Sequence, residues 1–172
     1  LLLPWRSVLD NVTLGLEVRG TPSAEARDRA MALIRRYGLA GFESARPRAL
    51  SGGMRQRVAF MRTLALDPKA ILLDEPFSAL DFQTRLILQG DVKRIIREQR
   101  KAAILVTHDI GEGIAMSDRV LVLSQRPGTV KAIHDIDLGE ATDPGALTRS
   151  SAFNEYFDTI WRQLAGHAQA TA

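Results

Sequence analysis

The chain has 172 residues, of which 45% are hydrophobic and 25% charged, the proportions of an ordinary folded domain rather than of a disordered or fibrous chain. Its 23 Lys and Arg residues and 20 Asp and Glu residues give a net charge of +3, and neither charge runs nor alternating aromatic and basic residues indicate a nucleic-acid partner. The absence of cysteine excludes disulfides, thiolate metal sites and a cysteine nucleophile, and no apolar stretch reaches the roughly 20 residues of a membrane-spanning helix.

The first 66 residues read mostly as helices. A short amphipathic helix is expected around residues 10–16. A second helix follows Thr21, an N-cap candidate, and Pro22, a good first helical residue, and it runs to Gly38. A third helix starts at the Ser-Gly-Gly of residues 51–53 and ends before Pro68.

Short apolar runs alternate with helices from residue 67 onward. Residues 70–73 and 102–106 are too short for helices and read as strands buried on both faces. Asp81 and Asp109 are placed to cap the helices that follow these two strands. Further strands are expected at 119–124 and 130–136, and the aromatic-rich face of a closing helix at 151–164 suggests core packing or a subunit contact.

This alternation predicts an α/β fold with a parallel sheet and helices on both sides. Within one domain, we expect a helical subdomain at 1–66, an α/β core at 67–140, and a C-terminal helix with a frayed tail at 141–172.

Polar residues follow both expected core strands. Asp74 and Glu75 end the first strand and His108 follows the second, at the sheet edge where α/β proteins bind ligands. Successive strand residues face opposite ways, so the two carboxylates are expected to have different neighbours and different tasks. Carboxylates beside a histidine suit Mg²⁺ and phosphate, although each feature alone is more often an ordinary turn or a packed histidine.

The helix that starts with Ser51, Gly52 and Gly53 exposes unpaired N–H groups and the positive end of a helix dipole. Such a start attracts anions. Taken alone, however, Ser-Gly-Gly before a helix is most often a simple cap.

Four motifs resemble those of the ATPase subunits of ATP-binding cassette (ABC) transporters. LSGGMRQR at 50–57 resembles the family signature, and AILLDEP at 70–76 resembles its Walker B strand. SALD at 78–81 resembles the D-loop, and Thr107-His108-Asp109 resembles the switch histidine with its flanks. The spacings also agree, with 23 positions from Ser51 to Asp74 and 34 from Asp74 to His108. The resemblance implies a P-loop NTPase-like fold.

The resemblance also implies roles for the residues at the strand ends. Asp74 holds Mg²⁺, Glu75 orients and deprotonates the water that attacks the γ-phosphate of ATP, and His108 contacts that phosphate.

In the family, two subunits pack head to tail around two nucleotides. Ser51, Gly52 and Gly53 would therefore bind the γ-phosphate of ATP held by a second copy of the chain, and Asp81 would lie where each site senses the other. Gln56 fits the signature and is expected near the ribose or the partner.

One family element has no counterpart in the chain. The Walker A cradle, Gly-x-x-x-x-Gly-Lys-Ser/Thr, does not occur, and Leu1 to Arg6 resembles the segment that immediately follows the family's active-site glutamine. We expect a chain truncated before residue 1, which by itself binds ATP weakly and hydrolyses it negligibly. The alternatives are a degenerate, non-catalytic cassette that serves as a partner or regulator, and a cassette ATPase with a role outside transport.

Three further strings resemble importers of nitrate, sulfonates and taurine: LLLPWRSVLDNV at 1–12, SALDFQTR at 78–85 and SQRPGTV at 124–130. The resemblance implies transmembrane permease partners, a solute-binding protein that acts indirectly, and a peripheral location on the cytoplasmic face of the membrane. Trp5 and Arg6 are expected near the groove that receives the permease's coupling helix, with packing as the alternative for Trp5.

Overall fold

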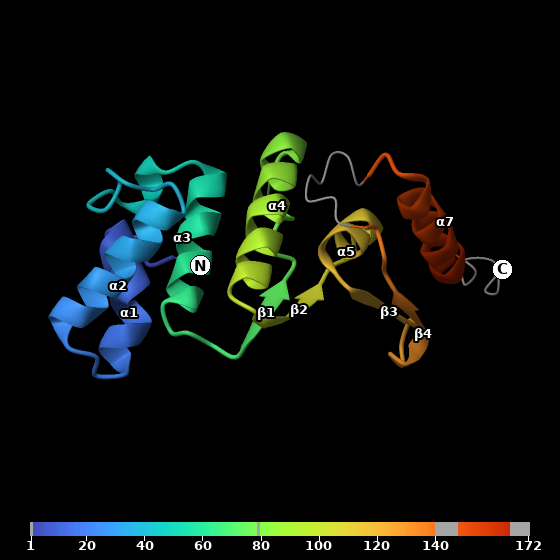
Figure 1. Cartoon of the computed structure of the whole chain (residues 1–172), viewed down its shortest axis with the longest axis horizontal. Helices are drawn as coiled ribbons and strands as arrows, with labels where there is room; N and C mark the ends of the chain where they lie inside the picture. Colours follow the sequence, from blue (N-terminus) through green and yellow to red (C-terminus); the bar gives the residue numbers. More distant parts are fainter. Residues whose placement is uncertain (1, 79, 140–147, 166–172) are drawn as a thin grey trace. The chain divides into compact units, whose positions relative to one another are not determined.

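The computed structural model describes residues 2–78, 80–139 and 148–165 (Figure 1). These residues form two compact units. One consists of Leu1–Ile71 and Ser78–Leu88, and we call it the helical unit. The other consists of Leu72–Phe77 and Gln89–Ala172, and we call it the sheet unit.

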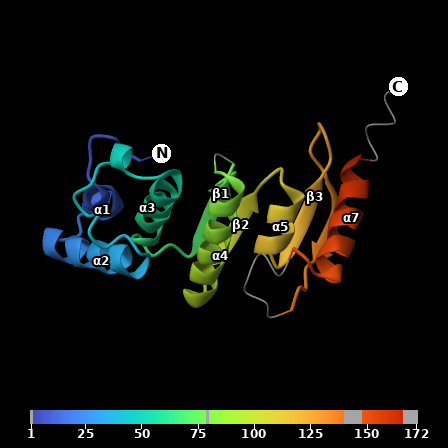
Figure 2. The same ribbon diagram turned by 90° about the horizontal axis from the view of Figure 1, so that it is seen from above.

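The helical unit is built on three α-helices that pack together: α1 (Val8–Val18), α2 (Ser23–Arg36) and α3 (Gly52–Leu64). Both views show α1 beside α2 and α3 (Figures 1 and 2). A short 3₁₀ turn, η1 (Pro47–Ala49), precedes α3. The residues that recur at helical spacing face one core, which includes Val8, Val12, Ile34, Val58 and Met61.

The three helices expected in this part of the chain are present, and two of them have shifted starts. Helix α2 begins at Ser23, with Pro22 as an N-cap that makes no side-chain bond, one residue later than the sequence pattern suggested. Helix α1 begins earlier than expected because Ser7 and Asp10 form a capping box, in which each side chain bonds to the backbone of the other.

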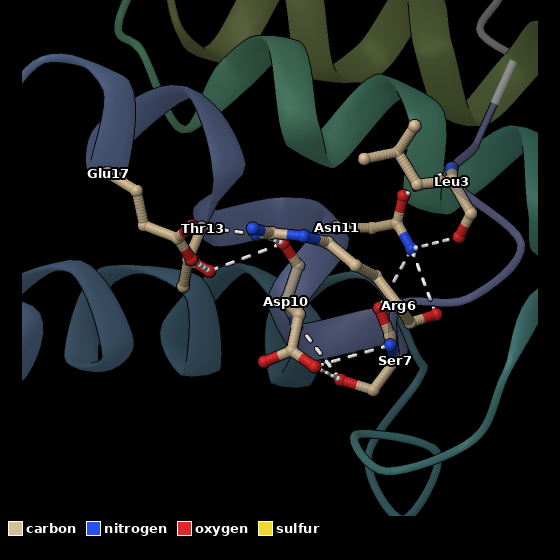
Figure 3. A network of polar contacts seen from close by, with 7 residues as sticks. All are labelled: Leu3, Arg6, Ser7, Asp10, Asn11, Thr13 and Glu17. Carbon is tan, nitrogen blue, oxygen red and sulfur yellow. Dashed lines mark hydrogen bonds and ion pairs between the residues drawn. The ribbon is translucent and has the colours of Figure 1, made fainter.

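A fully buried asparagine joins α1 to the segment before it (Figure 3). The Asn11 Nδ2 group donates hydrogen bonds to the carbonyl oxygens of Leu3 (3.1 Å), Arg6 (3.2 Å) and Ser7 (2.9 Å). Its Oδ1 accepts a hydrogen bond from the Leu3 N–H at 2.8 Å. Because a buried amide is costly unless it is bonded, these contacts hold residues 3–7 in one conformation.

The second part of the fold is a strand–helix–strand unit. Strand β1 (Ala70–Asp74) pairs in parallel with β2 (Ala102–Val106), and helix α4 (Phe82–Glu98) connects them. The expectation that both strands are buried on both faces is wrong for the described residues: Leu72 is 76% exposed and Ile104 is 60% exposed. Each strand has only the other as its β neighbour in the described part of the chain, so these side chains lack packing partners.

The rest of the sheet unit is an antiparallel hairpin covered by two helices. Strand β3 (Arg119–Leu123) pairs with β4 (Val130–Asp135), with Leu121 opposite Ile133. Helices α5 (Ile110–Met116) and α7 (Ser151–Ala165) both contact β3 (Figure 2). The shared core contains Ile114, Ala115, Val122, Phe153 and Ile160. The closing helix thus packs into the core, which was one of the two interpretations of its aromatic-rich face. The α/β class is confirmed, although the strands described form two small sheets.

In the described part of the chain, no helix is both long enough and apolar enough to cross a bilayer.

Replacing Asn11 should destabilise the helical unit. Asn11→Asp keeps the size of the side chain but replaces its N–H donors with an oxygen that faces the carbonyl oxygens of Leu3, Arg6 and Ser7. We expect the free energy of unfolding, measured by urea titration, to fall by roughly 1–3 kcal/mol or more. Val18→Ala, at an exposed position of the same helix, should change it by less than about 0.5 kcal/mol. Equal stability of the two variants would contradict the role given to Asn11.

Candidate functional site

Two of the predicted residues meet where β1 and β2 end. The Glu75 N–H, immediately after β1, donates a hydrogen bond to the carbonyl oxygen of Val106, the last residue of β2, at 2.8 Å. The side chains then meet: Nδ1 of His108 lies 3.0 Å from Oε1 of Glu75. The pairing of the strands therefore brings a carboxylate and an imidazole into direct contact from positions 33 residues apart.

Glu75 has an unusual backbone conformation. Its φ of 41° lies in the left-handed region, which costs a residue with a Cβ about 1–2 kcal/mol. Asp74 is the last residue of β1 and is exposed, whereas Glu75 lies in the turn beyond the strand. The alternation of strand side chains therefore does not set the direction of Glu75, contrary to the expectation from sequence. Such strain is commonly found at functional sites.

The contact with Glu75 changes the electrostatics of His108. The hydrogen bond to the Glu75 carboxylate and the attraction of its charge raise the pKa of His108 above its ordinary value of 6.5, with smaller contributions from Asp109 and Glu112. The two side chains are 74% and 48% exposed, so solvent and salt screen the pair. The imidazole is thus favoured in its charged form, which suits contact with an anion.

The backbone around His108 is held by its neighbours. The Thr107 Oγ1 accepts a hydrogen bond from the Asp109 N–H at 3.0 Å. Asp109 is the N-cap of α5, and its Oδ1 accepts from the Glu112 N–H at 3.0 Å. These bonds fix the turn between β2 and α5 that carries His108.

The Ser-Gly-Gly segment forms the expected helix start. Ser51 is the N-cap of α3 and its Oγ accepts a hydrogen bond from the Met54 N–H at 3.3 Å. Gly52 and Gly53 are the first two residues of the helix, where N–H groups have no partner within the helix. Gln56 follows on the same helix and is half-buried. A helix start of this form can bind an anion through backbone N–H groups.

The two glycines also lie against the segment around Asp81. A Cβ at Gly53 would lie 2.8 Å from Cγ2 of Thr84 and 3.5 Å from Cδ1 of Leu88. A Cβ at Gly52 would lie 3.3 Å from Cδ2 of Leu80. The first of these distances is shorter than real Cβ contacts allow, so Gly53 has no room for a side chain unless Thr84 moves.

Asp81 caps the helix that follows it. Its Oδ1 accepts a hydrogen bond from the Thr84 N–H at 3.0 Å, and this bond, with one from the Thr84 side chain, lowers the pKa of Asp81. Nη2 of Arg85 donates to the carbonyl oxygen of Leu80 at 3.3 Å. Thr84 and Arg85 were not among the predicted site residues, because both lie beyond the SALD string.

The predicted residues fall into two groups, one in each unit. Ser51, Gly52, Gly53, Gln56 and Asp81 belong to the helical unit. Asp74, Glu75 and His108 belong to the sheet unit.

The described residues contain no group of three or more His, Asp or Glu side chains placed to hold a metal. Mg²⁺ is usually bound by one or two carboxylates together with phosphate oxygens and water, and Asp74, exposed at the end of β1, suits that mode of binding.

The charge of His108 should depend on Glu75. Because the partner raises the pKa of His108, the pair contributes stability while the imidazole is charged, fully below about pH 6.5, and loses it as the pH rises through the folded pKa. In an NMR titration, Glu75→Gln should lower the pKa of His108, and added salt should reduce the difference from wild type. Glu155→Gln on α7 is the control and should leave the titration of His108 unchanged. An unchanged pKa in Glu75→Gln would show that the pair does not form in solution.

Residues 1–78 match the sequence model of the family described as ABC transporter. An uncharacterized ABC transporter ATP-binding protein of Bacillus subtilis, YtlC, is 48% identical over 95% of the chain, and the chain spans 63% of that protein. The aliphatic sulfonates import ATP-binding protein SsuB of Delftia acidovorans is 42% identical over 98% of the chain, which spans 65% of it.

A solved structure has the same fold. It is the dimeric, post-hydrolysis state of the ATP-binding cassette MJ0796 bound to ADP and Pi, with a TM-score of 0.62 and 32% identity, over 79% of this chain and 59% of the other. The match confirms the expected P-loop NTPase-like fold. By sequence and by fold, the chain is related to the ATPase domains of ABC transporters.

Proposed function

We propose that the complete gene product is the ATP-binding and ATP-hydrolysing subunit of an ABC importer for a small anion such as nitrate, a sulfonate or taurine. The observation that carries the proposal is the 3.0 Å contact between Glu75 and His108 at the paired ends of β1 and β2. The carboxyl ends of parallel strands are where α/β sheets bind ligands, and a carboxylate next to an imidazole there can supply a general base and a hydrogen-bond donor. We take residues 1–66, 67–140 and 141–172 as parts of one ATPase domain.

The sheet unit supplies the hydrolytic half of the site. Asp74 would hold Mg²⁺, and the bound ion would offset the charge of the phosphates. Glu75 orients the attacking water and accepts its proton. His108 donates a hydrogen bond to the γ-phosphate, and the raised pKa of its imidazole supports this role because the charged form is favoured. His108 must exchange its bond to Glu75 for a bond to phosphate, which frees the Glu75 carboxylate for the water.

The helical unit supplies the other half of the site. The N–H groups of Gly52 and Gly53, with the Ser51 hydroxyl, bind the γ-phosphate of a nucleotide held by a second copy of the chain. Asp81 lies at the junction between the two copies, and Gln56 approaches the ribose or the partner. The dimeric state of the MJ0796 cassette supports this assembly.

The transport role is supported by the names of relatives and by one surface feature. SsuB is named for the import of aliphatic sulfonates, the chemical class that includes taurine. Trp5 is 68% exposed, in the segment that Asn11 holds in place. We propose that this segment contacts a transmembrane permease. The subunit is then peripheral, on the cytoplasmic face of the membrane, and a solute-binding protein acts on it only through the permease. No nucleic acid is involved.

Removing the proposed base should abolish turnover without preventing nucleotide binding. In the complete gene product, Glu75→Gln should lower kcat for ATP hydrolysis by at least about 100-fold, because a general base contributes that much. The variant should still form dimers when ATP is added, as measured by light scattering. Glu155→Gln should retain wild-type turnover. Normal turnover in Glu75→Gln would remove Glu75 as the base, and a wild type without turnover would favour the non-catalytic cassette.

Replacing the exposed tryptophan should weaken binding to the membrane partner. Trp5→Ala removes a large, exposed aromatic side chain, so the free energy of unfolding should change by less than about 0.5 kcal/mol while the contact area with the permease falls. We expect less of the tagged Trp5→Ala protein to co-purify with permease from native membranes. Val18→Ala, exposed in the same unit, is the matched control. Equal recovery of permease with both variants would contradict this contact.

A further inference from the structure

We propose that Thr84 is a positioning residue that couples the Ser51–Gly53 turn to Asp81 within one chain, so that the phosphate-binding turn and the residue at the dimer junction move together. The inference rests on the proposed function of these two segments and adds a residue that neither motif contains. All of the contacts that support it lie within the helical unit.

The first contact is steric. Thr84 presents its Cγ2 methyl group to Gly53, at 2.8 Å from the place a Cβ would occupy. Gly53 is buried. Leu88, one turn further along α4, is also buried and would contact the same Cβ. The start of α3 and the first turns of α4 are therefore closely packed, with no space for an added side chain between them.

The second contact is polar. The Thr84 N–H donates to Oδ1 of Asp81 at 3.0 Å, and the Thr84 side chain also hydrogen-bonds to this carboxylate. Threonine therefore provides both a methyl group for Gly53 and a hydroxyl group for Asp81. Serine would keep only the hydroxyl group and valine only the methyl group, so the two contacts can be tested separately.

Neighbouring contacts support the same coupling. The space at Gly52 is limited by Leu80, which directly precedes Asp81, and Arg85 holds the Leu80 carbonyl oxygen. A shift at the start of α4 would therefore press Thr84 against Gly53 and Leu80 against Gly52. Because packed segments resist small displacements, a change in position at Asp81 is transmitted to the turn that starts with Ser51.

The steric contact is tested by a rescue experiment in the complete gene product. Gly53→Ala should lower the urea midpoint of unfolding and lower kcat/KM for ATP by about tenfold or more, because Thr84 must move. Adding Thr84→Ser removes the obstructing methyl group and should recover kcat/KM by about fivefold or more. Thr63→Ser, which removes a methyl group from an exposed threonine of α3, is the matched control and should recover nothing.

The polar contact is tested by Thr84→Val. This variant keeps the methyl group, so the urea midpoint should change little, but the NMR-measured pKa of Asp81 should rise as the hydroxyl bond is lost. We expect kcat to fall with little change in KM, because Asp81 contacts the partner rather than the nucleotide. An unchanged Asp81 pKa and unchanged kcat would overturn the link.

The outcomes separate this inference from the proposed function. If wild type and Glu155→Gln hydrolyse ATP but Thr84→Ser rescues neither the stability nor the activity of Gly53→Ala, the coupling is overturned and the proposed function stands. If the wild type does not hydrolyse ATP, the proposed function is wrong. The claim that the contact between Gly53 and Thr84 affects ATP turnover is then wrong as well. In that case the stability cycle alone decides whether Gly53 and Thr84 are in contact.

Discussion

One kind of local hydrogen bond sets the start of the helices next to which candidate residues lie. In this bond, a side-chain oxygen accepts a hydrogen bond from the N–H group three residues further on. Ser51 does this at the start of α3, Asp81 before α4 and Asp109 before α5. Ser7 does the same for α1. Each such cap contributes about 1 kcal/mol. Because the bond also sets the direction in which the chain enters the helix, it determines where the preceding residues lie.

These caps place several candidate residues, though not Gln56, Asp74 or Glu75, next to the start of a helix. His108 directly precedes the cap of α5, and Gly52 and Gly53 directly follow the cap of α3. In the second case the capping hydroxyl and the free N–H groups lie on the same turn, so a bound anion would be surrounded by donors. A glycine is required at position 53 for another reason as well, because the Thr84 methyl group occupies the space of a side chain.

The Glu75–His108 pair depends instead on strand pairing. The Glu75 N–H bonds to the last residue of β2, and this bond aligns the two strand ends. The left-handed backbone at Glu75 costs energy that the strand pairing and the contact with His108 help to offset. The bond to Glu75 favours the charged form of the His108 imidazole, and under the proposed function a phosphate would replace Glu75 as the partner of His108.

Features that depend on neighbours within about four residues could be predicted from the order of the amino acids. The helical spacing of Ala30 and Ile34, the caps at Ser51, Asp81 and Asp109, and the short apolar strands were all readable because each uses local bonds and a local period. Motif resemblance added the identity of the candidate residues. It did so because those residue types at those spacings rarely occur together by chance.

Contacts between positions far apart in the chain could not be predicted in this way. The approach of His108 to Glu75, the closure of Gly53 by Thr84 and the bonds from Asn11 to Leu3 depend on how whole elements pack, which no local pattern encodes. The same reason explains the wrong expectation for β1 and β2. An apolar run predicts that a strand can be buried, whereas burial itself depends on which elements pack against it.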